Sequence, residues 1–141
     1  MHRSPLDESP APPVVPQALR VVLAAVVVEV VALVAAGGFT LIELVRGNGS
    51  AGINIFLAAF AWALAAVLLA AVRGLRDGRR WGRSPVITWQ LFQAVIAITW
   101  LQAALNPFAV GLLVLALGIV VGLLLPPVVE ATTRDARTPD A

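Results

Sequence analysis

Four long runs of uncharged, apolar residues alternate with short polar segments along this chain of 141 residues. Each run holds about 20 residues, which as an α-helix is long enough to cross the roughly 30 Å hydrocarbon core of a bilayer. We therefore predict an all-α membrane protein, with a four-transmembrane-helix bundle over residues 18–129. The predicted spans are about 21–40, 53–72, 86–105 and 108–125.

The segments between the runs contain residues typical of turns and helix caps. Residues 47–52 are rich in glycine and predict a turn; Asn48-Gly49-Ser50 within them also matches a glycosylation acceptor, a match that is common by chance. Ser84-Pro85 and Asn106-Pro107 each place a capping residue before a proline, so we expect them to begin the third and fourth spans. So short a connection at Asn106 predicts an antiparallel hairpin. Pro126-Pro127 predicts the end of the fourth span.

The first apolar run continues past its predicted span to Val45, so it is longer than the hydrocarbon core requires. We expect the helix to tilt, to kink at Gly37-Gly38 or to protrude. A cleaved signal peptide is an alternative interpretation, because residues 34–37 are small. The proline-rich segment before the run and Glu29 within it argue against that alternative.

The composition supports a membrane protein and describes its ends. Hydrophobic residues make up 60% of the chain, charged residues 13%, and the mean hydropathy is +0.91, which is too apolar for an ordinary soluble domain. Residues 1–17 hold five of the ten prolines, so we predict a disordered, proline-rich cytoplasmic tail there. Residues 130–141 predict a polar cytoplasmic tail.

Arginine is concentrated between the second and third runs. Short loops rich in basic residues stay in the cytoplasm, so this segment predicts the orientation of the protein. Four spans then place both termini in the cytoplasm, with nine arginines inside and Arg46 alone outside. We expect a multi-pass protein of the bacterial cytoplasmic membrane, and, because the net charge of +2 is small, no nucleic-acid partner. The residues expected to contact anionic lipid headgroups are Arg73, Arg76, Arg79, Arg80 and Arg83.

Glu29 is the only ionisable residue in the central parts of the four predicted spans. An acidic residue at that depth costs about 2.5–3.5 kcal/mol on insertion scales, so it requires an explanation. It can be a proton or cation site, or a neutral group that hydrogen-bonds a glutamine on another helix and fixes the packing. The third span presents Gln90 and Gln93 on one face, and we expect Glu29 to contact one of them.

The third span also carries a second polar stripe. Both stripes together could line a narrow wet path through the bundle, although helix packing alone would explain them. The residues of this second stripe are Thr88, Thr99, Gln102 and Asn106.

Small residues recur at helical spacing in the second and fourth runs, where they allow close approach of helix backbones. The fourth run has a GxxxG motif, which suits a homo-oligomer, a partner in a membrane complex, or packing inside the chain against the alanine-rich second span. The residues are Ala59, Ala63, Ala66 and Ala70, with Gly111, Gly118 and Gly122.

The aromatic residues have expected places too. Trp81 and Trp89 fall near the predicted inner interface, where tryptophan anchors spans, and Trp62 lies deeper, as a packing residue.

The residues needed for common catalytic sites are missing from the sequence. There is no cysteine and no lysine, and the one histidine, His2, lies in the N-terminal tail. A Ser-His-Asp triad, a phosphate-binding loop with lysine and a metal-binding cluster therefore cannot be assembled. We expect no catalytic residue, metal or cofactor, and predict that the protein is not an enzyme.

Two resemblances follow from these motifs. The proline-rich leader, the first run with Glu29, the segment GRRWGRSP at 78–85 and the glutamines of the third run resemble small four-span integral membrane proteins of actinobacteria, which implies a membrane location and no particular activity. The sequence AVVVEV at 25–30, with glycines in the fourth run, is similar to small multidrug-resistance transporters. That resemblance implies a dimer in which Glu29 is the shared proton and cation site, but the longer tails and strong arginine bias depart from that family.

From the sequence we predict a small structural or accessory membrane component that packs with itself or with a larger membrane complex. The alternative is a proton-coupled small-molecule transporter that uses Glu29 as its coupling group.

Overall fold

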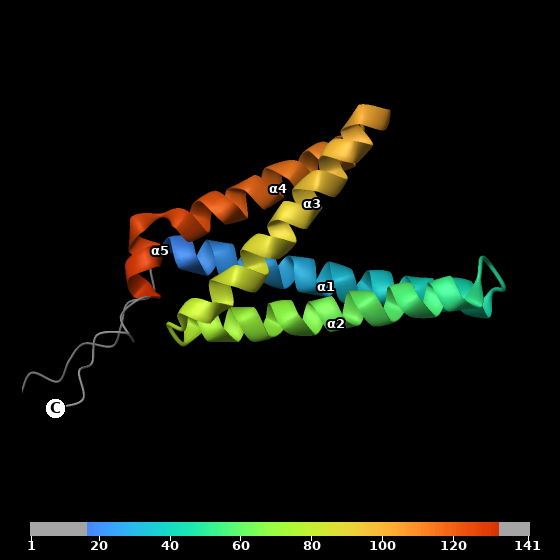
Figure 1. The fold of residues 1–141 in the computed structure, drawn as a ribbon, viewed down its shortest axis with the longest axis horizontal. Coiled ribbons are helices and arrows are strands. Elements are labelled where there is room, and N and C mark those ends of the chain that lie inside the picture. The colour runs from blue at the N-terminus through green and yellow to red at the C-terminus, as the bar shows by residue number, and fades with distance from the viewer. Residues whose placement is uncertain (1–16, 133–141) are drawn as a thin grey trace, which may run out of the picture.

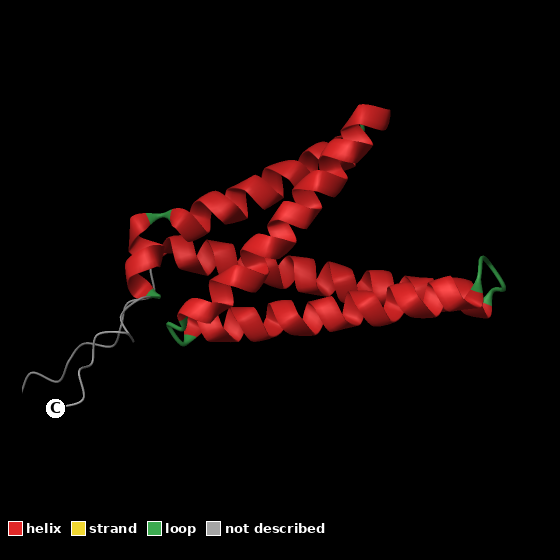
Figure 2. Ribbon diagram, viewed as in Figure 1, coloured by secondary structure: helices red, strands yellow, loops and turns green. Residues whose placement is uncertain are grey.

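The computed structural model describes residues 17–132, which form helices joined by short turns (Figures 1 and 2). This part of the chain is all-helical, and four of its helices are long and apolar enough to cross a membrane, as predicted. They are α1 (Gln17–Val45), α2 (Ala51–Arg76), α3 (Arg83–Ala103) and α4 (Pro107–Leu124); a 3₁₀ turn, η1 (Arg80–Gly82), and a short helix, α5 (Pro126–Ala131), complete the order.

The predicted tails lie largely outside the described residues. Of the N-terminal tail only Gln17 is described, and it begins α1. Of the C-terminal tail, Glu130 and Ala131 belong to α5 and Thr132 is buried, and its other residues lie outside the described part of the chain.

The helices form two hairpins. Helix α1 packs along α2, and α3 packs against α4 (Figure 1). The hairpins meet at the end that holds the start of α1, the α2–α3 connection and α5, and they diverge toward the other end. The buried residues of α3 reflect this: Val86, Gln90, Gln93 and Ala97 all lie before its last six residues.

The core is therefore concentrated where the hairpins meet. Burial of aliphatic side chains against each other is favoured by shape complementarity and dispersion contacts in a membrane as in water. Its largest fully buried aliphatic members are Val26, Leu68, Leu75, Val86, Leu123 and Val128.

Helix α1 is unbroken across Gly37-Gly38, so the kink considered there does not divide it. Gly37 instead makes room for Trp62 of α2: a Cβ at Gly37 would lie 2.5 Å from Trp62 Nε1. The indole donates a hydrogen bond to the Val34 carbonyl oxygen at 3.2 Å. Trp62 is thus a packing residue, as predicted. The 29 residues of α1 extend about 44 Å at 1.5 Å per residue, beyond a hydrocarbon core of roughly 30 Å.

The α1–α2 connection is the turn that the sequence predicts. Gly47 and Gly49 have φ of 77° and 76°, a region that side chains with a Cβ rarely occupy. Glu43 pairs with Arg46 at 3.0 Å and accepts a second hydrogen bond from Asn48 Nδ2 at 2.7 Å. The side chain of Asn48 therefore belongs to the turn.

The α2–α3 connection is shorter than the sequence suggests. Helix α2 continues through Arg73 and Arg76, and α3 begins at Arg83, before Ser84-Pro85, so the serine is not the cap that was predicted. Gly82 permits this tight connection, because a Cβ there would lie 2.7 Å from the Ala71 carbonyl oxygen.

The α3–α4 connection matches the prediction. The Asn106 side chain accepts a hydrogen bond from the Phe108 backbone N–H at 2.9 Å, and Pro107 occupies the first turn of α4.

Candidate functional site

A buried polar cluster joins the two hairpins. Glu29 of α1 is 6% exposed, and Gln90 and Gln93 of α3 are 0% and 6% exposed. Gln90 Nε2 donates a hydrogen bond to Glu29 Oε2 at 2.7 Å, which confirms the predicted contact between the first and third spans. This hydrogen bond is buried, and it joins side chains of two different helices.

Trp89 is a member of this cluster that the sequence did not reveal. The indole of Trp89 and the amide of Gln93 lie near the Glu29 carboxyl group, and neither nitrogen has a hydrogen-bond partner in the described residues. Trp89 is half-buried, and its Nε1 is enclosed. It therefore packs against the core, and its role as an interfacial anchor stays a prediction. The signal was its spacing: Trp89 and Gln93 are four residues apart, on one helix face.

The cluster leaves several polar atoms without a hydrogen-bond partner in the described part of the chain. Two are oxygens, Glu29 Oε1 and Gln90 Oε1, and two are donors, Trp89 Nε1 and Gln93 Nε2. A carboxylate can only accept hydrogen bonds, whereas a carboxylic acid also donates one. A protonated Glu29 would have a hydrogen to donate to an unpaired oxygen such as Gln90 Oε1, whereas an ionised Glu29 would offer Oε1 as an acceptor to the unpaired donors Trp89 Nε1 and Gln93 Nε2. The arrangement can hold two helices together, and it can also hold a proton.

The second polar stripe of α3 does not join this cluster. Thr88, Thr99 and Gln102 are exposed. The hydroxyl group of Thr99 donates a hydrogen bond to the Val95 carbonyl oxygen of the same helix at 2.9 Å. Asn106 caps α4. The two stripes therefore do not line one path inside the described helices.

The glycines of α4 face two different environments. Gly122 packs directly against the Val22 side chain of α1, whereas Gly111 and Gly118 have no atom within 4 Å of the position that a Cβ would occupy. The sequence allows this face to pack against the alanines of α2, but the partner of Gly122 in the structure is α1. Of the two glycines in the GxxxG motif, only Gly122 packs against another helix of the described chain.

The alanine stripe predicted on α2 is also displaced. Ala59, Ala63 and Ala66 are exposed and Ala70 is half-buried. The alanines of α2 that are buried are Ala58, Ala61, Ala65 and Ala71.

The arginines of the α2–α3 region divide into two groups. Arg83 turns inward: its Nη2 donates to the Val128 carbonyl oxygen of α5 at 2.8 Å. Its Nε is buried as well. It therefore ties α3 to α5, and only the other four stay fully available to lipid headgroups. These four exposed residues are Arg73, Arg76, Arg79 and Arg80.

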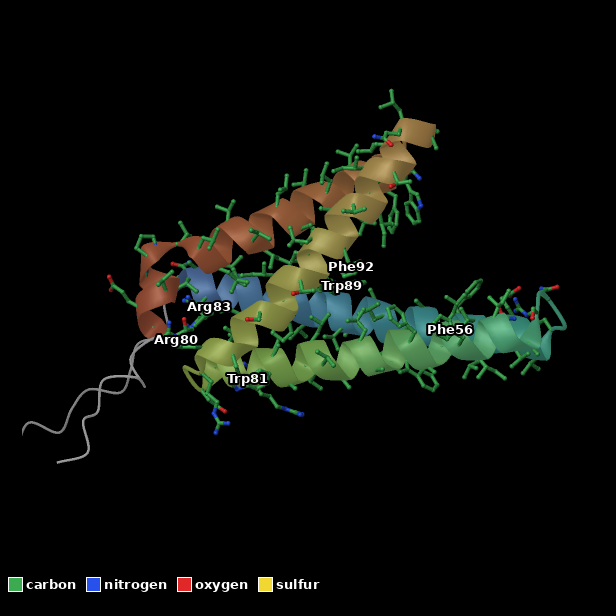
Figure 3. The ribbon with its side chains drawn as sticks, in the orientation of Figure 1. Phe56, Arg80, Trp81, Arg83, Trp89 and Phe92 are labelled. Carbon is green, nitrogen blue, oxygen red and sulfur yellow. The ribbon has the colours of Figure 1, made fainter. Side chains whose placement is uncertain are left out.

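Trp81 stands beside these arginines, near Arg80 and Arg83 (Figure 3). Its ring is half-exposed and lies over Gly74, where a Cβ would come within 3.0 Å of it. This position at the end of the bundle agrees with an interfacial anchor.

Residues 17–132 contain no group of three or more acidic or histidine side chains arranged to bind a metal ion. Comparisons with protein-family models, curated proteins and solved structures gave no match to the chain.

Proposed function

We propose that the protein is a small structural or accessory component of the bacterial cytoplasmic membrane, oriented with its arginine-rich end in the cytoplasm. Six of the seven arginines in residues 17–132 belong to the start of α1 or to the α2–α3 region, which lie at one end of the molecule (Figures 1 and 3). Arg46 lies at the opposite end of α1. Such an asymmetry favours retention of the arginine-rich end in the cytoplasm.

The observation that carries the accessory role is the uncovered surface of the α3–α4 hairpin. Its outer half diverges from α1 and α2 (Figure 1), and large apolar side chains such as Phe92 and Val95 are 63% exposed on α3. Gly111 and Gly118 of α4 have open space at the position that a Cβ would occupy. An apolar helix with open glycines suits close packing against another transmembrane helix, from a second copy or from a larger complex.

Substitution of the open glycines tests this role. Gly111→Ile and Gly118→Ile should abolish association in mild detergent, measured by cross-linking and by co-purification with a differently tagged copy or with other membrane proteins. Gly38→Ile is the matched control, because Gly38 of α1 also has open space around it. Wild-type protein that is monomeric and co-purifies with nothing contradicts the proposal, as does equal association of all variants.

A proton-coupled transporter is the second candidate, and the unpaired oxygens of Glu29 and Gln90 favour it. A carboxyl group held by one donor, with its second oxygen free, can take up and release a proton without dismantling the hydrogen bond to Gln90. The similarity of the first run to small multidrug-resistance transporters points the same way.

Glu29→Gln distinguishes the two candidates, because it retains the size and one acceptor of the side chain while removing its ionisation. An accessory protein keeps its abundance and assembly in this variant. A transporter loses pH-dependent binding of a hydrophobic cation such as tetraphenylphosphonium. Glu43→Gln is the matched control, since Glu43 lies on the same helix in the surface pair with Arg46. If wild-type protein binds no such cation at any pH at which it stays folded, a transporter of hydrophobic cations is excluded.

A further inference from the structure

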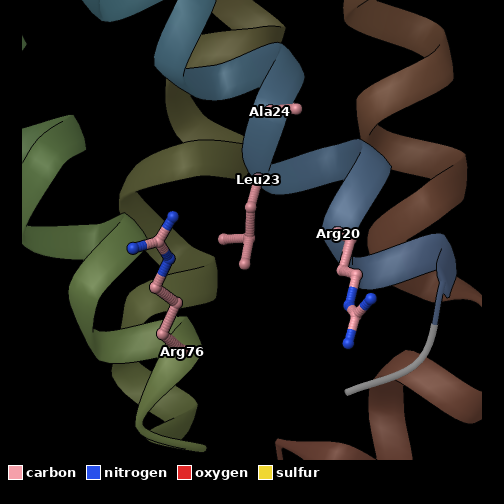
Figure 4. Close-up of a pocket in the computed structure, with 4 residues that line it drawn as sticks. All are labelled: Arg20, Leu23, Ala24 and Arg76. Atoms are coloured by element: carbon pink, nitrogen blue, oxygen red, sulfur yellow. The ribbon is translucent and has the colours of Figure 1, made fainter.

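A hollow bordered by two arginines lies where α1 begins and α2 ends. It has a volume of about 390 Å³ and is lined by Arg20, Leu23 and Ala24 of α1 and by Arg76 of α2 (Figure 4). Leu23 is buried and lies between the two arginine side chains in this view. The hollow therefore has cationic sides and an apolar floor.

No acidic side chain of the described residues neutralises these two arginines. Both are exposed, and neither side chain forms an ion pair or a hydrogen bond within residues 17–132. Arg46 does form an ion pair, with Glu43, but this pair lies at the other end of α1 from the hollow. Two positive charges at the hollow are thus available to an anion.

An apolar strip continues from the hollow along α1. Ala24, Val28 and Val31 are exposed and follow Arg20 at intervals of four, four and three residues, which places them on one face of the helix. Val28 and Val31 are 64% and 63% exposed. A small free anion would gain nothing from this strip, whereas a lipid can lay an acyl chain along it.

We propose that the hollow binds one anionic phospholipid, with its phosphate between Arg20 and Arg76 and an acyl chain along Ala24, Val28 and Val31. Guanidinium groups form paired, charge-assisted hydrogen bonds with phosphate oxygens. Anionic headgroups are found at the cytoplasmic surface of the membrane, which is where the proposed orientation puts the arginine-rich end. The inference rests on the helices crossing a membrane in that orientation, and it depends on neither the accessory role nor the chemistry of Glu29.

Lipid binding by the purified full-length protein tests this site. In mild detergent, added dioleoylphosphatidylglycerol should bind saturably at one lipid per chain, measured by native mass spectrometry. Dioleoylphosphatidylcholine, which has the same chains and no net charge, should bind at least tenfold more weakly, and so should inorganic phosphate. Equal binding of the two lipids, or of phosphate alone, overturns the proposal.

Variants locate the site. Arg20→Gln and Arg76→Gln should each weaken phosphatidylglycerol binding about fivefold, since one basic residue near an anionic surface contributes about a factor of five. Arg79→Gln removes a charge that also faces headgroups but lies outside the hollow, so it should weaken binding less than either of these two variants. Ala24→Trp fills the hollow without changing any charge and should also weaken binding.

Two results would replace the site by a diffuse attraction to the arginine-rich end: equal losses in all three arginine variants, or unchanged binding by Ala24→Trp. Helical circular dichroism of each variant shows that it is folded. If the protein inserts with its arginine-rich end in the cytoplasm but does not bind the anionic lipid specifically, this proposal alone is refuted and the proposed function stands.

Discussion

The contact between Gly122 of α4 and Val22 of α1 allows a direct test of how the two hairpins pack. In Gly122→Ala, the new Cβ would overlap Val22 Cγ2, and Val22 Cβ is 3.9 Å from the same position. Both residues are buried, so the strain can be relieved only by a new Val22 rotamer or by separation of the helices. Overpacking of this kind costs about 1–3 kcal/mol, roughly a 5- to 140-fold change in the unfolding equilibrium.

Unfolding by sodium dodecyl sulfate added to mild-detergent micelles, followed by tryptophan fluorescence, measures this change. Gly118→Ala is the control, one helical turn away and with open space around its Cβ position, and we expect it to differ from wild type by less than about 1 kcal/mol. Val22→Ala removes the overlapping methyl groups, so the double variant Val22→Ala with Gly122→Ala should be less destabilised than the sum of the single variants.

A coupling energy of about 0.5–3 kcal/mol is expected for residues in contact. The contact between Gly122 and Val22 is contradicted if the single effects add to within about 0.5 kcal/mol, or if Gly122→Ala is no more destabilising than Gly118→Ala. Either result would mean that α1 and α4 do not approach each other at this point.

Three further substitutions test other contacts, two by the same unfolding assay and one by the fluorescence spectrum of Trp62. Gly82→Ala should destabilise by about 1–3 kcal/mol, because its Cβ would meet backbone rather than a movable side chain; stability equal to wild type would contradict the tight α2–α3 connection. Gly37→Ala should displace the Trp62 indole and shift its fluorescence spectrum, measured in a protein whose other tryptophans have been replaced. An unchanged spectrum would contradict the contact between Gly37 and Trp62. Gln90→Leu should lower the free energy of unfolding by about 1–2 kcal/mol, because it leaves Glu29 without its donor. The double variant Gln90→Leu with Glu29→Leu should be nearly as stable as wild type. A large loss of stability in the double variant would argue against a packing role.

The sequence was informative about the number and positions of the helices because long uncharged runs have few alternatives to a helix in a membrane. The contact between Glu29 and Gln90 was also predictable. Polar side chains are scarce in these spans, and those at similar depth seek each other.

The rotation of each helix was not predictable in the same way. The fourth run is apolar on all sides, so its pattern does not indicate which glycine faces the bundle; Gly118 and Gly122 differ by a single helical turn, yet only Gly122 packs inside. On α2, the buried alanine Ala58 is the immediate neighbour of the predicted Ala59. The inward turn of Arg83 depends on α5, a short helix that the sequence pattern did not suggest.

Labelling of single cysteines in intact bacterial cells tests the central claim most directly, because the chain has no cysteine of its own. Ser50→Cys lies in the α1–α2 turn and Asp77→Cys in the α2–α3 connection, at opposite ends of α2. A membrane-impermeant maleimide should label Ser50→Cys from outside the cell and should label Asp77→Cys only after the membrane is permeabilised. Labelling of Asp77→Cys in intact cells, or recovery of the protein from the soluble fraction, would contradict a four-helix membrane protein with its arginine-rich end in the cytoplasm.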